Sequence, residues 1–434
     1  MSAGIGRFPA ERLLLLPGLM MGAIMAGTAQ DLSRAYSPLA IGPLTLRNRF
    51  IKSATNEGMS PGGVPSRQLV QFHAAMAAGG VGLTTVAYCA VSPDGCTLPN
   101  PSCLDSATLP HLRALTEAVH AQGGAVSAQI THGGCFTFIQ APGQRRPLSA
   151  SGGFNKIGLM SGQYLKRQMS VADMQRVAAD FANGARLARE AGFDAVEIHM
   201  GHGYLLSQFL SPLYNRRRDE YGGSLDNRLR FPRQVLRQVL DAVGNDLAVI
   251  CKYSITEGVR GGNGIEEGVG IARGLAAEGA HLLVLSAGLN AESITTMFGS
   301  SFPPENRAVV TNPVMKAAMF VQSLIEKPVP FRELYLLDHA RRIRAAVDVP
   351  LAYLGGVTSA AGVAQLMADG FETVAMGRVL IHDPGWVARL QEGQPRSGCT
   401  ACNRCVTMMY TEGGTSCVLN GPGDAALNRL PAAG

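Results

Sequence analysis

The stretch VADMQRVAADFANGARLAREAGFDAVEIHMG, residues 171–201, contains a complete helix–strand unit. Its first part is amphipathic, with apolar residues at spacings of four, four and three, as on one face of a helix: Val177, Phe181, Ala185 and Ala188. Ser170 precedes this part and Asp173 follows three residues later, an acidic variant of a capping box that predicts the helix start. The final run, FDAVEIHMG, is mostly apolar and is typical of a parallel strand buried on both faces.

Seven further short, apolar, β-branched runs are spread along the chain, and amphipathic stretches such as residues 224–244 lie between them. The seven runs occupy residues 47–55, 82–91, 125–131, 247–255, 281–288, 350–357 and 373–381. Eight strand–helix cycles over about 350 residues fit a closed (β/α)8 or TIM barrel, of the α/β class, better than an open sheet. An open doubly wound sheet would carry a G-x-G-x-x-G turn after its first strand, and none follows residues 47–55.

We therefore predict three parts: an apolar N-terminal extension over residues 1–30, a barrel over 31–395 and a cysteine-rich C-terminal segment over 396–434. Residues 13–29 have about the length of the apolar core of a signal peptide. A hydrophobic helix docked on the barrel, or an over-extended start site, would explain them equally well. No twin-arginine pair precedes the run, so we expect a cytoplasmic protein, with export left open.

The charge is spread thinly along the 434 residues. Lys and Arg number 38 and Asp and Glu number 32, which gives a net charge of +6. This excess argues against a nucleic-acid partner and is compatible with a small ligand that bears a phosphate.

Reactive residues fall where a barrel places its chemistry, at the carboxyl ends of strands. His199, His202 and Tyr204 follow the fourth run. Two imidazoles there can donate hydrogen bonds to one carbonyl oxygen, and a phenol can deliver a proton to the α-carbon of a conjugated C=C. A mutually satisfied polar pair and a metal site remain alternative interpretations.

A phosphate site is predicted after the last two strands. Gly355 and Gly356 follow the seventh run, and Gly377 and Arg378 lie within the eighth. Barrels often bind phosphate at this pair of loops, where glycines expose backbone N–H groups and an arginine supplies charge.

Four cysteines form the pattern Cys399-x2-Cys402-x2-Cys405-x11-Cys417. Thiolates at these spacings suit an iron–sulfur cluster or a tetrahedral zinc ion, and free cysteines are the remaining interpretation.

Residues 192–231 resemble the signature segment of the old yellow enzyme family of flavin-dependent reductases. The run S-P-x-x-N-x-R-x-D-x-Y-G-G-S, from Ser211 to Ser224, carries the resemblance most specifically. It is closest to the barrel part of bacterial 2,4-dienoyl-CoA reductases and trimethylamine dehydrogenases, and it extends over about residues 31–420.

The resemblance implies FMN at the barrel mouth. It implies that the backbone of Ser53, Ala54 and Thr55 touches the flavin and that Ala87 faces the ring. It further implies that Gln129 hydrogen-bonds the pyrimidine edge and that Lys252 lies near N1 and O2 of the flavin. A cation at that place stabilises reduced, anionic flavin. The resemblance also assigns the four cysteines to a [4Fe–4S] cluster. No nucleotide-binding fingerprint follows Cys417, so we expect no electron donor to the cluster within the chain.

The chain departs from the family pattern at three positions. Asn56 stands where relatives carry Thr, Cys or His, so a cysteinyl-flavin bond is not available, and Cys135 replaces a frequent Arg. The only tryptophan is Trp386, which argues against the aromatic bowl of an amine dehydrogenase. The long loop 289–332, which is expected to shape the substrate entrance, matches no specificity rule.

We therefore expect an FMN-dependent ene-reductase that transfers hydride from NAD(P)H to an unsaturated carbonyl compound of low molecular weight. The alternatives are an amine or other dehydrogenase that passes electrons through the cluster to a partner protein, and a non-catalytic electron-transfer subunit. A phosphate-handling barrel lyase ranks third, and homo-oligomer formation is left open.

Overall fold

The computed structural model describes residues 31–98, 102–141, 143–293, 330–411 and 413–420, with a few single positions between 313 and 321. The expected N-terminal extension, most of the loop 289–332 and the end of the cysteine-rich segment lie outside the described residues. Among the residues described, no helix is both long and apolar enough to cross a bilayer.

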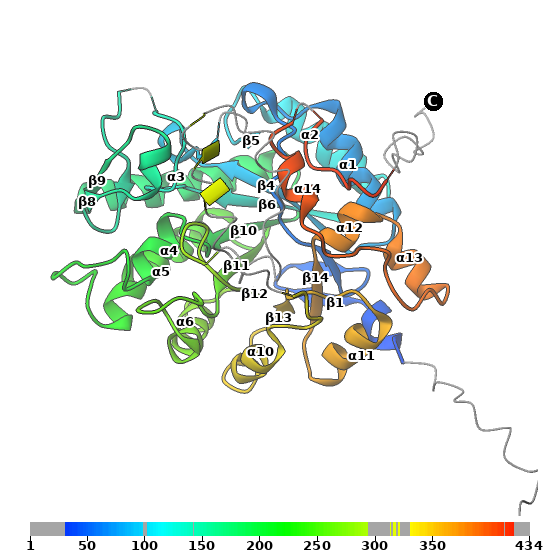
Figure 1. Ribbon diagram of the computed structural model, residues 1–434. Coiled ribbons are helices and arrows are strands. Elements are labelled where there is room, and N and C mark those ends of the chain that lie inside the picture. The colour runs from blue at the N-terminus through cyan, green and yellow to red at the C-terminus, as the bar shows by residue number, and fades with distance from the viewer. Residues whose placement is uncertain are drawn as a thin grey trace, which may run out of the picture.

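Eight parallel strands form a closed barrel, which confirms the predicted fold (Figure 1). The sheet closes because β3 pairs with both β14 and β4. The barrel strands are β3 (Phe50–Lys52), β4 (Leu83–Ala90), β6 (Ala125–Thr131), β10 (Ala195–Met200), β11 (Ala248–Ser254), β12 (Leu282–Ser286), β13 (Leu351–Tyr353) and β14 (Thr373–Met376). Each lies within one of the eight predicted runs.

Helices surround the strands, as Figure 1 shows. They are α1 (Arg67–Ala78), α2 (Leu109–His120), α3 (Val171–Glu190), α5 (Leu225–Val243), α6 (Ile265–Ala277), α10 (Leu337–Arg344), α11 (Ala360–Ala368) and α13 (Trp386–Gln391). The capping box predicted for α3 is present, with Ser170 and Asp173 each bonding the other's backbone N–H. The predicted helix over residues 224–244 is α5.

Three predicted strands are much longer than the observed ones. In the first run only Phe50–Lys52 pairs as a strand, and in the seventh only Leu351–Tyr353. The eighth run was expected to continue to residue 381, but β14 ends at Met376 and α12 (Arg378–His382) begins two residues later. There the apolar character continues past the ladder because α12 is also buried, and apolar runs do not distinguish a strand from a short buried helix.

Smaller elements decorate the barrel. They are the hairpin β1 (Leu39–Ile41) and β2 (Leu44–Leu46), the added strand β5 (Ser102–Cys103), the small sheet of β7 (Leu148–Ser149), β8 (Gly153–Phe154) and β9 (Leu165–Gln168), the 3-10 turns η1 (Ser33–Tyr36), η2 (Pro61–Gly63), η3 (Pro93–Gly95) and η4 (Ile157–Met160), and the short helices α4 (Leu205–Leu210) and α14 (Arg404–Met408).

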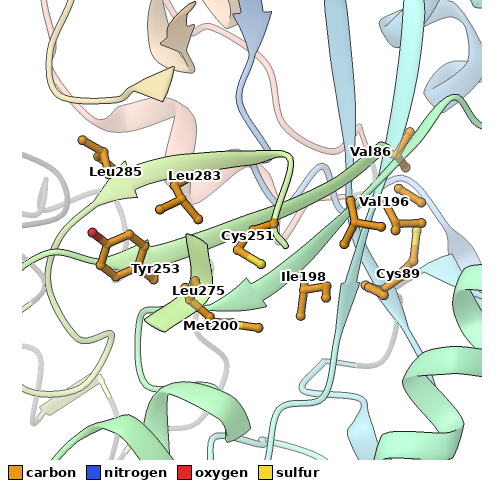
Figure 2. Close-up of a cluster of buried hydrophobic side chains, with 14 of the residues drawn as sticks. Val86, Cys89, Val196, Ile198, Met200, Cys251, Tyr253, Leu275, Leu283 and Leu285 are labelled. Carbon is orange, nitrogen blue, oxygen red and sulfur yellow. The ribbon is translucent and has the colours of Figure 1, made fainter. Parts of the chain in front are cut away.

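The main apolar core lies between the outer face of the barrel and the helices. Val196, Ile198 and Met200 alternate along β10 and join one buried cluster with Tyr253 of β11 and Leu275 of α6 (Figure 2). The residues between them on β10, including Glu197 and His199, therefore face the barrel interior. This alternation leaves the interior positions free to carry polar chemistry.

Candidate active site

The turn after β10 brings His199, His202 and Tyr204 to the barrel mouth. His202 has a φ of 60°, and Gly203 after it has a φ of 83°, so the chain reverses through two left-handed residues. Glycine at 201 lets the turn approach β11, since a Cβ there would lie 3.1 Å from Ser254 Oγ. The His199 and Tyr204 rings are 4.6 Å apart between centroids.

The two imidazoles are bonded to each other. The Gly201 N–H donates to His199 Nδ1 at 3.3 Å, which leaves the proton of the neutral ring on Nε2. His199 Nε2 is 3.3 Å from His202 Nδ1, and His202 Nε2 is 2.7 Å from Ser286 Oγ. This order assigns both N–H groups to partners within the protein, so donation to a substrate oxygen requires the His199–His202 bond to open.

Burial keeps these groups neutral. It lowers the pKa of His199 well below its ordinary value and that of His202 to about 3, with a further contribution from the Lys252 charge. Burial also raises the pKa of the Tyr204 phenol, which a hydrogen bond with Asn290 offsets only in part. Near pH 7 the site therefore presents neutral imidazole donors and a protonated phenol.

Lys252 is a buried cation without a direct counter-charge. Its ammonium donates to Ser53 Oγ at 3.1 Å and to the Ala54 carbonyl at 3.3 Å, and the residue is 3% exposed. Within the described residues no carboxylate lies in ion-pair distance of it, and burial lowers its pKa, partly offset by Glu197. A buried ammonium with two neutral acceptors fits a site for an anionic or electron-rich group.

Gln129 lies beside this cation on β6. Its Nε2 donates to Glu197 Oε1 at 2.6 Å, which fixes the amide and leaves its carbonyl oxygen for another donor. Ala87 lies on β4, and its N–H donates to Glu57 Oε2 at 2.9 Å. Thr55 Oγ1 accepts from Lys52 Nζ at 3.0 Å.

The loops after β13 and β14 offer free backbone donors. The N–H groups of Gly355, Gly356 and Gly377 bond no acceptor in the part of the chain that the structure describes. Gly356 has a φ of 78°, and a Cβ there would meet the rings of Tyr335 and Phe331 at 3.0 to 3.1 Å, so a larger residue would crowd this loop. Converging free N–H groups fit a phosphate.

Arg378 stands beside these glycines but is engaged elsewhere. Its Nη1 donates to Asn403 Oδ1 and, at 3.4 Å, to the Ala401 carbonyl, and its guanidinium lies 5.5 Å from the centre of the Phe331 ring. The arginine thus ties the phosphate loops to the cysteine-rich segment.

The cysteine-rich segment docks on the loop that follows β3. Thr415 donates from its N–H to the Glu57 carbonyl and from its hydroxyl to the Asn56 carbonyl, each at 2.7 Å. Gln68 of α1 donates to the Gly413 carbonyl at 2.6 Å. These bonds hold the segment against the loop in which Asn56 replaces the family residue.

The four cysteines of this segment do not form a site for a single metal ion. Among the described residues, no group of three or more His, Cys, Asp or Glu side chains is arranged to hold one. The four cysteines are nevertheless close together, since the charge of a neighbouring cysteine contributes to the raised pKa of Cys399, Cys405 and Cys417. Burial is the main cause that raises the pKa of Cys399, Cys405 and Cys417.

Sequence reasoning missed three groups at the mouth. Ser286 holds His202, Asn290 holds Tyr204, and the buried pair Lys52–Glu57 lies under the loop of Thr55, with Nζ and Oε1 2.5 Å apart. Ser286 could have been found because it lies near the carboxyl end of a predicted strand. Asn290 contacts Tyr204 from a distant segment, which leaves no local signal. Lys52 and Glu57 are five residues apart, but their burial depends on the barrel around them.

Comparisons with known proteins agree with this fold. Residues 34–397 match the model of the NADH:flavin oxidoreductase / NADH oxidase family. The chain is 39% identical over 395 residues to a 4,4'-dithiodibutanoate disulfide reductase of Rhodococcus erythropolis, which covers 88% of this chain and 94% of that protein. It is 32% identical over 378 residues to an NADH oxidase of Thermoanaerobacter brockii, covering 85% of this chain and 52% of that protein.

The chain thus spans nearly all of the first relative and about half of the second. An old yellow enzyme homologue from Zymomonas mobilis superimposes with a TM-score of 0.67 over 88% of this chain and 98% of that one, at 21% identity, which shows the shared fold. The chain belongs to the NADH:flavin oxidoreductase / NADH oxidase family, that of old yellow enzyme, and is an NAD(P)H:flavin oxidoreductase.

Proposed function

We propose that the protein binds FMN across the barrel mouth and reduces the activated C=C bond of an unsaturated carbonyl compound at the expense of NAD(P)H. The observation that carries this proposal is the group at the end of β10, where two neutral imidazoles and a protonated phenol share one buried turn. When bound, FMN would supply hydride transfer between the nicotinamide and the substrate.

The residues of the chain fit that cofactor. Lys252 would lie against its electron-rich pyrimidine edge and Gln129 beside the same edge, with Ser53, Ala54, Thr55 and Ala87 around the ring. Gly355, Gly356 and Gly377 would hold the phosphate through their free N–H groups, with Arg378 beside them. The role of Lys252 rests on a buried cation and the role of the three glycines on free N–H donors already present.

His199 and His202 would orient the substrate. A carbonyl oxygen that displaces the bond between the two rings would accept from His199 Nε2, while His202 stays positioned by Ser286. Polarising the carbonyl makes the β-carbon a better hydride acceptor. Tyr204 would then protonate the α-carbon.

Replacing Tyr204 by Phe tests this assignment. The variant should keep FMN and be reduced by NAD(P)H at the wild-type rate, while reoxidation by an enone such as cyclohexenone slows by about 100-fold or more, because general acids contribute that much. Tyr36→Phe is a matched control, since that phenol bonds the Val387 carbonyl away from the mouth. Equal slowing of both half-reactions in Tyr204→Phe would contradict the proposed role.

Reduction of a low-molecular-weight disulfide is the second candidate. It is favoured by the relative named a disulfide reductase, which this chain matches over 94% of that protein's length. Anaerobic stopped-flow mixing of the NAD(P)H-reduced protein with cyclohexenone or with 4,4'-dithiodibutanoate separates the two activities. The faster flavin reoxidation identifies the preferred substrate class.

We propose that the four cysteines bind an iron–sulfur cluster, and their spacing and mutual proximity support this proposal. Iron and acid-labile sulfide in equal amounts would support it. Zinc, or neither metal, in freshly purified protein would contradict it.

A further inference from the structure

Two further cysteines, Cys96 and Cys103, lie at the same barrel mouth, outside the cysteine-rich segment. Cys96 follows the turn η3 after β4, and Cys103 ends β5, which pairs in parallel with β4 so that Cys103 stands opposite Ala90. Cys96 also packs against Ala90, so both thiols lie beside the same residue of β4, close enough to affect each other's pKa, and the Cys96 thiol donates to the Ser92 carbonyl at 3.8 Å. Both side chains are half-buried, whereas Cys89, Cys135 and Cys251 are fully buried.

The pair is close to the proposed catalytic group. Cys96 packs against the cluster of Ala87, Tyr88 and Ala90. The next residue, Thr97, donates its N–H to the Tyr88 hydroxyl at 2.9 Å, and the Tyr88 ring lies 6.1 Å from that of Tyr204. The thiols are therefore on the wall of the same mouth, next to the strand that is expected to face the flavin.

The two thiols differ in acidity as partners in a dithiol do. The interaction between the two thiols lowers the pKa of Cys103 and raises that of Cys96. The Asp94 charge raises the pKa of Cys96 and the Asp105 charge that of Cys103, but for Cys103 the neighbouring thiol outweighs burial and charge. Burial raises the pKa of the Cys89, Cys135 and Cys251 thiols. Cys103 is accordingly the better nucleophile.

We propose that Cys96 and Cys103 form a redox-active dithiol that reduces low-molecular-weight organic disulfides by thiol–disulfide exchange. The Cys103 thiolate attacks one sulfur of RS–SR, the S–S bond breaks, and one RS⁻ leaves and takes up a proton. The Cys96 sulfur, on losing its proton, then attacks Cys103 Sγ and expels the second RS⁻. In sum, two protein thiols are oxidised to one disulfide and RS–SR is reduced to two RSH.

Renewal of the dithiol consumes one hydride and one proton per turnover. This step rests on the proposed function, which supplies NAD(P)H as the reductant. The exchange itself needs no nicotinamide, so the two can be tested separately.

The experiment uses the full-length protein, reduced, desalted and kept anaerobic, with 4,4'-dithiodibutanoate and no NAD(P)H. Peptide mass mapping of the wild type should show a Cys96–Cys103 disulfide. Cys96→Ser should stop at a mixed disulfide on Cys103, whereas Cys103→Ser should leave Cys96 unmodified. Cys135→Ala, which removes a buried thiol from another loop, should behave as the wild type.

Unmodified Cys96 and Cys103 in the wild type, or a mixed disulfide that never resolves into their bond, would overturn the proposal. NAD(P)H added after the exchange should reopen the bond. If the bond forms but NAD(P)H does not reopen it while the flavin is still bleached, the exchange site stands and the disulfide-reductase function fails.

Discussion

The two ends of the barrel interior are built from the same alternating positions but carry opposite chemistry. Toward the amino ends of the strands the inward side chains form an apolar plug together with Ile41 and Leu46 of the β1–β2 hairpin. The strand residues of this plug are Ile51, Leu83, Ala195, Ala248, Ile250, Leu282, Val284, Ala352 and Ala375. Toward the carboxyl ends the same faces carry Gln129, Glu197, His199 and Lys252, all almost fully buried.

This difference shows where the fold accepts an energetic cost. The apolar end is closed by the β1–β2 hairpin, from which Ile41 and Leu46 enter the plug. At the other end, burial lowers the pKa of Lys252 and His199 and raises that of Glu197, so it favours the neutral form of all three groups. The ionisable groups with shifted pKa values lie at the carboxyl end of the interior. This indicates that the carboxyl end is maintained for chemistry and the amino end for stability.

The largest effect is expected from placing a charge in the apolar plug. Leu83→Glu should lower the free energy of unfolding by at least about 4 kcal/mol, because a carboxylate there has no partner. Leu83→Met keeps volume and polarity and should cost less than about 1.5 kcal/mol. Urea denaturation measures both. A Glu variant as stable as the Met variant would remove the distinction between the two ends.

The next largest effect is expected from the buried ion pair Lys52–Glu57, which lies at the carboxyl end of β3 on its outer face. Glu57→Gln keeps an acceptor for the Ala87 N–H but leaves the Lys52 ammonium unpaired, so we expect a loss of about 3 kcal/mol. The double variant Lys52→Met, Glu57→Gln should recover at least half of this loss in the same assay. A single variant within about 1 kcal/mol of the wild type would mean that the buried pair is unimportant.

A pH dependence should report the buried imidazoles. The folded-state pKa of His202, about 3, lies below the unfolded value near 6.5, so the unfolded state binds the proton first and stability is lost as pH falls below 6.5. At pH 5 this amounts to about 2 kcal/mol. Glu257, whose pKa burial raises to about 7, acts with the opposite sign.

The Glu257 contribution cancels when variants are compared. Unfolding free energies at pH 5 and pH 7.5 should therefore differ by about 2 kcal/mol less in His202→Gln than in the wild type. Identical pH profiles of the two proteins would show that His202 is not held in its neutral form by the fold.

The smallest effect is expected midway between the two ends. The Ser127 hydroxyl on β6 is buried and has no hydrogen-bond partner among the described residues. Ser127→Ala removes an unsatisfied group and should change the free energy of unfolding by less than about 0.5 kcal/mol. A loss of more than about 1 kcal/mol would reveal a partner, and polar chemistry would then extend deeper into the barrel.

The barrel was predictable from sequence because its strands lie within short apolar runs that alternate with long amphipathic helices. Residues 171–192 and 224–244 gave α3 and α5 almost to the residue. The hairpin β1–β2 and the small sheet of β7, β8 and β9 were not predicted. Their strands have two to four residues, too few to display alternation.

The candidate site was predictable in position more than in arrangement. Strand ends located His199 and His202 at the mouth, since every parallel strand of a barrel points the same way, and the family resemblance placed Lys252 there. The bond between the imidazoles corresponds to the alternative interpretation of a mutually satisfied polar pair. The anchoring of Arg378 by Asn403 was not predicted, because it joins two segments that local sequence patterns do not connect.

FMN binding at the carboxyl end is the central claim, and titrating the purified protein with FMN tests it most directly. Quenching of flavin fluorescence should saturate at one FMN per chain, and Lys252→Met should weaken the binding. Protein that is folded by circular dichroism yet neither carries FMN nor takes it up would contradict the account.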